Sequence, residues 1–331
     1  MAVELITVAV DDADLRLDRW FKRRYPGLGH GKLEKLLRTG QVRVDGKRMK
    51  AGDRLEPGQV VRVPPLGDTS EESRPRPEKK RAPRFTPEDE AMIRDCVIHR
   101  DKDVIVLNKP PGLATQGGTN TFLHVDALLD ALKFDSEERP RLVHRLDKDT
   151  SGVLLLGRTA NAAAALAKAF KSREARKVYW ALVMGVPDPR AGTIKAPIAK
   201  MEYAGSEKME VNVEEGQSAI TDFRTVDNAG RRVAWVHFEP RTGRTHQLRV
   251  HAAYLGTPIV GDGKYGGAEA HLHGEGISRK LHLHARAIIL PHPAGGTLRI
   301  IAPLPEHMAR SFEFFDFDES EERDPFARPA G

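Results

Sequence analysis

The chain is organised around the stretch RLVHRLDKDTSGVLLLG, from Arg141 to Gly157. Two apolar runs, 142–143 and 153–156, flank a polar segment, and the second run ends at the glycine. A short run of leucine and β-branched residues bounded by a glycine indicates a buried strand. The polar residues 144–151 therefore form a turn between buried strands, where a rigid scaffold presents side chains for function.

Asp147 is the candidate functional residue of this turn. The residues that follow at 149–151 are ordinary turn formers, whose side chains hydrogen-bond to nearby backbone. Arg145 and His144 precede Asp147 closely, and a neighbouring cation favours the ionised form of a carboxyl group. Most aspartates in such turns have a structural role, so the rest of the chain must decide between structure and catalysis.

Length and composition indicate a globular protein of about two domains. The chain has 331 residues, of which 40% are hydrophobic, and a net charge of +6. Its one cysteine, Cys96, excludes an intramolecular disulfide framework and a cysteine-cluster metal site. The N-terminus has no basic stretch before an apolar one, and nowhere do about 18 apolar residues run together. We therefore expect a cytoplasmic protein without a membrane span.

Residues 13–64 have the pattern of a small domain. Apolar residues have helical spacing at 15–21 and again at 33–37, where Gly40 ends the second helix. Strand-like pieces follow at 41–44 and 59–63, and the first meets the hairpin signal Asp-Gly. From residue 16 to residue 50 there are twelve basic and three acidic residues, a local charge of +9. Such a bias on a small surface favours a nucleic-acid partner.

The motifs RLDRWFKRR, GKLEKLLRTGQVRVDGKRMKAGDRL and PGQVVRV resemble the small RNA-binding S-four domain. The resemblance implies that the second helix and the VDGK turn lie against RNA backbone, without base-specific contacts. We expect RNA contacts from Arg16, Arg19, Lys32, Lys35, Arg38 and Lys47.

Two segments lack the apolar residues of a core. Residues 65–90 are rich in Pro, Ser and charge, which predicts a flexible linker that keeps the first domain near the ligand of the second. Residues 311–331 are acidic and end in Pro and Gly, which predicts a disordered tail. The second domain is then expected at 91–310.

The second domain alternates strand and helix patterns. Strands are indicated in 96–112 and at 177–183, and helices at 124–133 and 160–170. Tyr179 alternates with its neighbours in a strand, a pattern that is more often typical of a half-buried packing residue than of a base-stacking one.

An arginine- and histidine-rich segment follows the strand VAWVHF. Thr245 is placed to cap a helix that Gly256 ends. The basic side chains near its start are Arg241, Arg244, His246, Arg249 and His251. They can form a phosphate clamp, or one arginine can turn inward to meet a carboxylate.

Metal and cofactor chemistry is not indicated. The pairs His271/His273 and His282/His284 are two residues apart, but they lack a carboxylate or cysteine companion, and no HExxH motif occurs. Leu146 interrupts the H-R-D pattern of a kinase loop. Phosphate-binding and dinucleotide-binding glycine motifs are absent from the sequence. We expect neither a metal nor a cofactor.

Several long motifs, in order over residues 13–305, resemble the RluA-type pseudouridine synthases, in the branch with an N-terminal S-four domain. These motifs are NKPPGL, HRLDKDTSG, KVYWALV, RTGRTHQLRVHAAYLGTPIVGD and KLHLHA. The resemblance implies an α+β catalytic domain with a mixed, largely antiparallel sheet and no cofactor. It is nearest to the RluC-like members, which modify large-subunit ribosomal RNA.

The resemblance also implies residue roles. They are Asp147 as the catalytic aspartate, Tyr179 as the stack for the target base, Arg249 as the partner of the aspartate, Arg145 as the side chain that enters the RNA helix when the uridine leaves, and Leu283 as an apolar pocket contact. Arg244 and Leu281 lie close to the last two motif positions and are alternatives for Arg249 and Leu283, with Arg244 expected to bind substrate.

The implied reaction suits these residue types. The isomerisation breaks the glycosidic bond, turns the base and joins the sugar to a ring carbon, without redox change or energy input. A carboxylate can serve as nucleophile or proton acceptor. Extruding the base costs roughly a few kcal/mol, which an inserted arginine and a stacking tyrosine can offset.

We expect ribosomal RNA of the large subunit as the partner of a monomer that has no protein partner. Two alternatives stay open. One is a pseudouridine synthase that acts on transfer RNA, and the other is a non-catalytic RNA-binding factor of ribosome assembly.

Overall fold

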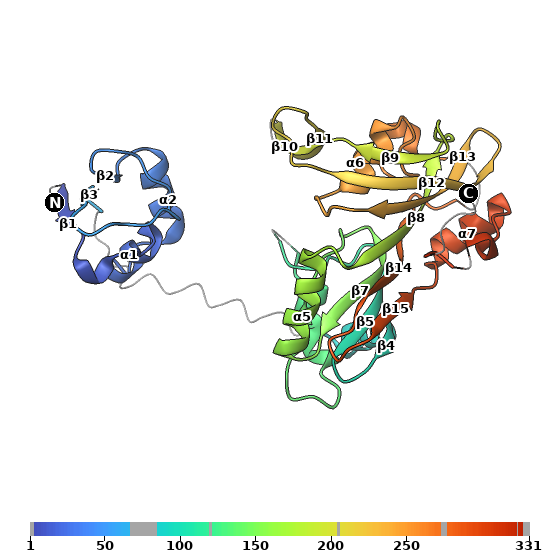
Figure 1. Cartoon of the computed structure of the whole chain (residues 1–331), viewed down its shortest axis with the longest axis horizontal. Coiled ribbons are helices and arrows are strands. Elements are labelled where there is room, and N and C mark those ends of the chain that lie inside the picture. The colour runs from blue at the N-terminus through green and yellow to red at the C-terminus, as the bar shows by residue number, and fades with distance from the viewer. Residues whose placement is uncertain are drawn as a thin grey trace. The chain divides into compact units, whose positions relative to one another are not determined.

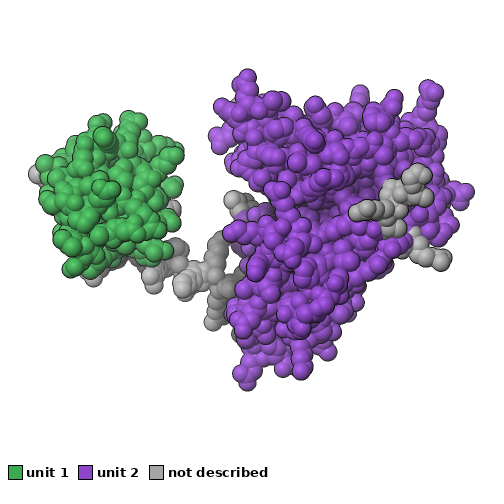
Figure 2. Space-filling view, in the orientation of Figure 1, with its two compact units in different colours: residues 1–83 green, residues 84–331 purple. Residues whose placement is uncertain are grey.

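The computed structural model describes residues 3–66, 85–118, 121–203, 206–272, 277–322 and 324–326. The chain divides into two compact units, residues 1–83 and 84–331 (Figure 2). Among the described residues, no helix combines the length and the apolar character needed to cross a membrane.

The first unit packs two helices against a small antiparallel sheet with the strand order β1-β3-β2 (Figure 1). Its elements are β1 (Glu4–Thr7), η1 (Val10–Asp12), α1 (Leu17–Arg24), α2 (His30–Arg38), β2 (Arg43–Val44) and β3 (Val60–Val63). Trp20 and Phe21 of α1 are buried, and the Trp20 indole donates to the Asp12 carboxylate at 3.1 Å. The predicted boundary at residue 13 omitted β1, which belongs here because it pairs with β3.

The Asp45-Gly46 hairpin signal is confirmed. Both residues have positive φ, +48° and +76°, and the backbones of Val44 and Lys47 bond to each other across the turn. Two positive φ values are the geometry of the tight hairpin turn that Asp-Gly favours.

The second unit is built on a ten-stranded sheet, with the order β4-β5-β7-β14-β8-β13-β12-β9 and with β6 and β15 beside β7 and β14. The pairs are antiparallel except β7 and β14, which are parallel. The sheet strands are β4 (Val97–Arg100), β5 (Val104–Lys109), β6 (Arg141–Leu142), β7 (Ser151–Gly157), β8 (Arg176–Met184), β9 (Ala191–Lys195), β12 (Ile220–Ala229), β13 (Val233–Pro240), β14 (Leu283–Pro291) and β15 (Thr297–Ile301). The predicted mixed, largely antiparallel sheet is confirmed.

The remaining elements surround this sheet. They are the hairpin of β10 (Ile198–Tyr203) and β11 (Ser206–Val211), the helices α3 (Pro87–Asp95), α4 (Val125–Leu128), α5 (Ala160–Lys171), α6 (Gln247–Tyr254) and α7 (Glu306–Phe315), and the short turns η2 (Leu129–Leu132), η3 (Gly267–Ala270) and η4 (Glu319–Glu322). The helices predicted at 124–133 and 160–170 are present, the first as α4 continued by η2.

Strand β7 lies between β5 and β14, and all seven of its residues are buried. Gly152 has φ +108°, and a Cβ atom there would lie 2.3 Å from the carbonyl oxygen of Ala285 in β14. A side chain is therefore excluded where β14 approaches β7. This close approach brings the turn before β7 next to β14 and its neighbour β8.

The predicted linker ends earlier than expected. Helix α3 begins at Pro87, inside the range 65–90, because Thr86 and Asp89 form a reciprocal capping box and Pro87 occupies the first turn. The middle of that range, 67–84, lies outside the described residues.

The prediction of a disordered acidic tail at 311–331 is wrong for the described residues 311–322 and 324–326. Helix α7 packs the buried ring of Phe312 against Trp180 and Trp235, and Phe317 and Phe326 are also buried. Two of the acidic side chains have basic partners in the sheet, since Glu322 pairs with Arg224 and His237, and Glu319 pairs with Arg286. The aromatic residues within the acidic run supply the core contacts that charge alone does not predict.

Candidate active site

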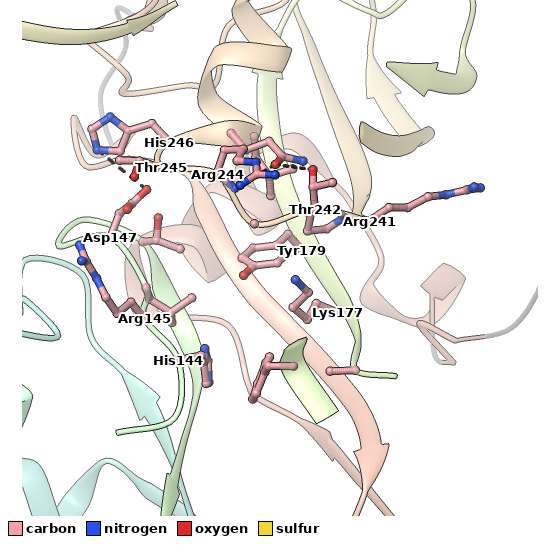
Figure 3. A pocket seen from close by; sticks show the side chains of 18 of the residues that line it. His144, Arg145, Asp147, Lys177, Tyr179, Arg241, Thr242, Arg244, Thr245 and His246 are labelled. Atoms are coloured by element: carbon pink, nitrogen blue, oxygen red, sulfur yellow. Dashed lines mark hydrogen bonds and ion pairs between the residues drawn. The ribbon is translucent and has the colours of Figure 1, made fainter. Parts of the chain in front are cut away.

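A cavity of about 1180 Å³ lies at the ends of β7, β8 and β14 (Figure 3). Its lining includes all six residues that the sequence assigned to catalysis or substrate binding. They are Arg145, Asp147, Tyr179, Arg244, Arg249 and Leu283. The tertiary fold thus brings together side chains from segments that are far apart in the sequence.

The turn that carries Asp147 is clamped from two sides. The Thr115 hydroxyl donates to the Leu146 carbonyl at 2.7 Å and accepts from the Leu146 N–H at 3.2 Å. On the other side, the Lys109 ammonium donates to the carbonyl of Lys148 at 3.0 Å. The carboxylate keeps 28% of its side-chain exposure and faces the cavity, so the backbone is fixed while the functional group stays accessible.

Lys109 belongs to the NKPPGL motif, and the sequence alone gave it no role. Its fully buried ammonium donates to three carbonyls, those of Pro110, Leu113 and Lys148. Burial lowers the pKa of Lys109 to about 8, while the nearby carboxylates of Asp149 and Asp147 oppose this shift. The lysine joins the β5 loop to the turn that carries the aspartate.

Tyr179 extends from β8 into the cavity opposite Asp147 (Figure 3). Its backbone pairs with Phe238 of β13 and Ala285 of β14, which fixes the strand on both sides. Burial first, and the negative charge of Asp147 second, raise the pKa of the Tyr179 hydroxyl. The ring is therefore a neutral, rigidly held aromatic surface, which suits stacking on a base.

The predicted ion pair between Arg249 and Asp147 is wrong. Arg249 donates through Nε and a terminal nitrogen to the two oxygens of Asp262, at 2.8 and 2.7 Å. Within the described part of the chain, no ion pair joins Arg249 to Asp147. Asp262 is fully buried in the loop that follows α6, and its carboxylate lies closer to the Arg249 guanidinium than that of Asp147 does. The sequence left open that one arginine of this segment turns inward to meet a carboxylate. Arg249 does so, but its partner is Asp262 and not Asp147.

The imidazole of His246 lies next to Asp147, with 4.0 Å between Nε2 and Oδ2. Its Nδ1 lies 2.6 Å from the Tyr265 hydroxyl, which itself accepts the Met209 N–H at 3.4 Å. When the Tyr265 hydroxyl donates to Nδ1, the proton of the neutral imidazole lies on Nε2, facing Asp147. Burial is the largest effect on the pKa of His246 and lowers it, which favours the uncharged ring.

The start of α6 differs from its prediction. Thr245 does not cap the helix, because His246 occupies the capping position with φ +53° and α6 begins at Gln247. The buried Gln247 amide braces the turn instead, since its oxygen accepts from the Thr242 hydroxyl at 2.7 Å and from the Arg244 N–H at 3.0 Å. This left-handed backbone turns the imidazole of His246 toward the aspartate.

His144 does not crowd Asp147 as the sequence suggested. Its Nε2 accepts the Leu155 N–H at 2.9 Å, and its ring stacks on Phe170 with centroids 4.4 Å apart. Burial lowers the pKa of His144 to about 3, so it is uncharged and braces β7. Arg145, in contrast, is exposed at the cavity.

The predicted substrate contacts Arg244 and Leu283 both line the cavity. Arg244 donates to the Ser218 carbonyl and to the Gln217 side chain, at 3.1 and 2.8 Å. Leu283 is buried at the start of β14 and gives the cavity an apolar contact, whereas Leu281 faces a smaller neighbouring pocket.

Of the paired histidines, His282 and His284 are engaged with protein groups, whereas Nδ1 of His271 is buried without a hydrogen-bond partner among the described residues. His282 bonds to the Lys280 carbonyl and to the Ser311 hydroxyl, and His284 bonds to the Ser151 hydroxyl at 2.9 Å. His273 lies outside the described residues.

The RNA-binding residues predicted in the first unit fall into two groups. Arg16 pairs with Asp18 at 2.7 Å, and Lys32 donates to the Leu66 carbonyl at 2.7 Å. The other four are exposed and have no side-chain hydrogen bond or ion pair with a described residue. They are Arg19, Lys35, Arg38 and Lys47.

Known proteins are similar to this chain along most of its length. The profile of a family described as RNA pseudouridylate synthase matches residues 103–254. The ribosomal large subunit pseudouridine synthase C of Escherichia coli (strain K12) is 34% identical over 317 residues, covering 94% of this chain and 96% of that protein. The mitochondrial RNA pseudouridine synthase 4 of Arabidopsis thaliana is 34% identical over 382 residues, covering 92% of this chain and 80% of that protein.

A solved structure is also similar to this chain. The human RNA pseudouridylate synthase domain containing 4 superposes with a TM-score of 0.59 and 29% identity, covering 69% of this chain and 97% of that one.

Proposed function

The chain belongs to the RNA pseudouridylate synthase family, and on this basis we propose that it isomerises specific uridines of large-subunit (23S) ribosomal RNA to pseudouridine. Relatives named ribosomal large subunit pseudouridine synthase C match along 94% of the chain, a length that includes the basic N-terminal unit. The observation that carries the proposal is the cavity in which an accessible carboxylate, Asp147, faces a neutral aromatic ring, Tyr179.

The proposed reaction uses these two groups on a flipped uridine. The base leaves the RNA stack and lies on Tyr179, while Arg145 occupies the place it left. The N1–C1′ bond breaks, the base turns, and a C5–C1′ bond forms. C5 then loses its proton and N1 gains one, so atoms and charges balance. Asp147 acts as the nucleophile or the proton acceptor.

Asp147 needs a fixed orientation for either role. In the proposed site the Nε2–H of His246 supplies it, because the Tyr265 hydroxyl holds the imidazole in the required tautomer. The 4.0 Å separation is one that bound substrate can shorten, since catalytic hydrogen bonds often tighten only in the complex.

The first unit is proposed to be an S-four-type domain that holds RNA by its phosphates. Two short helices followed by the Asp45-Gly46 hairpin, with the exposed Arg19, Lys35, Arg38 and Lys47, support this. Exposed cations without protein partners are free to contact phosphate oxygens.

The substrate is tested by mapping pseudouridine in ribosomal and transfer RNA from cells that lack the protein. We expect specific sites of 23S ribosomal RNA to remain unmodified uridine in these cells. The wild-type gene should restore pseudouridine at the same sites. Loss of sites in transfer RNA alone would contradict the ribosomal assignment, although the isomerase activity would stand.

The role of the first unit gives a second expected result. Replacing Arg19, Lys35, Arg38 and Lys47 together by glutamine should weaken RNA binding and flatten its salt dependence, because each lost phosphate contact removes roughly 0.7 to 0.9 from the logarithmic slope. Removing residues 1–63 should act in the same direction. Binding is measured by filter retention at several salt concentrations.

A matched control removes the same charge from exposed positions of the second unit. These positions are Arg190, Lys195, Arg231 and Arg232. An equal change of slope in both four-fold variants would attribute the effect to net charge and would count against a specific role of the first unit.

A further inference from the structure

Lys177 lies in the wall of the cavity, two residues before Tyr179 on strand β8. Side chains two apart on a strand share one face, so both project toward the same space. Figure 3 shows the Lys177 amino group in the cavity close to the Tyr179 ring. The sequence alone gave this lysine no role.

The Lys177 ammonium is partly buried, and within the described part of the chain it has no hydrogen bond or ion pair. Other partly or fully buried cations in the described part of the second unit have partners, including Lys109 with three carbonyls, Arg158 with Asp135, Arg176 with Glu239, Arg224 with Glu322, Arg249 with Asp262 and Arg286 with Glu319. Burial lowers the pKa of Lys177, which reflects the cost of holding this charge away from water.

An unpaired, desolvated charge destabilises a fold, and an apolar side chain of similar length is tolerated better in such a place. Packing therefore does not explain Lys177. An oxygen atom with negative charge, delivered by a ligand of the cavity, is the partner that the ammonium lacks.

We propose that the Lys177 ammonium binds an anionic oxygen of the uridine nucleotide held in this cavity. The proposal rests on the proposed function for the identity of that nucleotide. Two oxygens fit the chemistry. One is a carbonyl oxygen of the uracil, which becomes negative when the N1–C1′ bond breaks and the base keeps the electron pair. The other is a phosphate oxygen next to the target nucleotide.

The test compares Lys177→Met, which keeps length but removes charge, with Lys177→Arg, which keeps charge. We expect Lys177→Met to melt no lower than the wild type and to form pseudouridine about 100- to 1000-fold more slowly, a range typical for loss of one electrostatic donor. Lys177→Arg should recover part of the rate. Lys168→Met, on the exposed face of α5 and away from the cavity, is the matched control.

Single-turnover rates and RNA affinities separate the two oxygens. A lower rate with unchanged affinity assigns the contact to the uracil oxygen. Weaker affinity, together with insensitivity of Lys177→Met to a methylphosphonate at the target phosphate, assigns it to the phosphate. The proposal is overturned if Lys177→Met keeps both values within twofold of the wild type, or if Met and Arg variants lose activity and stability equally. All comparisons use an RNA that the wild type modifies, so a wrong ribosomal assignment would appear separately as an inactive wild type on 23S RNA.

Discussion

Replacing Asp147 by asparagine should abolish pseudouridine formation in a protein that still folds and binds RNA. The amide has the shape of the carboxylate, but it is neither a nucleophile nor a proton acceptor of useful strength. We expect the single-turnover rate to fall by at least about 10⁴-fold, as is typical when the central group of covalent or general-base catalysis is removed. The rate is measured by release of tritium from 5-³H-uridine RNA.

Asp149→Asn is the control for this experiment, because it makes the same chemical change two residues away in the same turn. It should retain activity within a few-fold of the wild type. An active Asp147→Asn protein would reduce the aspartate to a turn-forming role and would favour the non-catalytic RNA-binding alternative.

Breaking the buried pair of Arg249 and Asp262 should give the largest loss of stability among single changes near the cavity. Asp262 is fully buried and the Arg249 side chain is 9% exposed, so Asp262→Asn leaves a guanidinium charge without its counter-charge. Removal of one partner of such a pair costs about 3 to 5 kcal/mol. The free energy of unfolding is measured in urea, with Trp180 and Trp235 fluorescence reporting on the second unit.

Activity should fall with stability in this variant. Asp262 also accepts the Tyr265 N–H at 3.2 Å, and the Arg249 guanidinium lies 5.0 Å from the centre of the Tyr265 ring. Loss of the pair therefore releases the tyrosine that holds His246 toward Asp147. The double variant Arg249→Met/Asp262→Leu should regain much of the stability, because no unpaired charge remains, but not the activity. An Asp262→Asn protein with wild-type stability and rate would contradict a supporting role for this pair.

Elements with local signals could be predicted from the amino-acid sequence. The apolar run before Gly157 became β7, the alanine-rich segment became α5, and KVYWALV became β8, because burial patterns and caps act over a few residues. The long contiguous motifs also identified the family and named the six side chains that line one cavity. The acidic tail was predicted wrongly because its order depends on distant contacts. Its three buried phenylalanines belong to one core cluster with Trp180 and Trp235, which lie far away in the sequence.

Which charged side chains pair, and which titratable groups are ionised, depends on how the chain folds in three dimensions. The sequence predicted an ion pair of Arg249 with Asp147, but in the folded chain Arg249 pairs with Asp262. Burial keeps His144 uncharged, so it supports β7 through a hydrogen bond. The hydrogen bond between Tyr265 and His246 holds the imidazole next to Asp147. The fold also leaves Lys177 without a partner among the described residues beside the substrate space. Such outcomes depend on desolvation and on contacts between residues distant along the chain, and neither is encoded in local pattern or spacing.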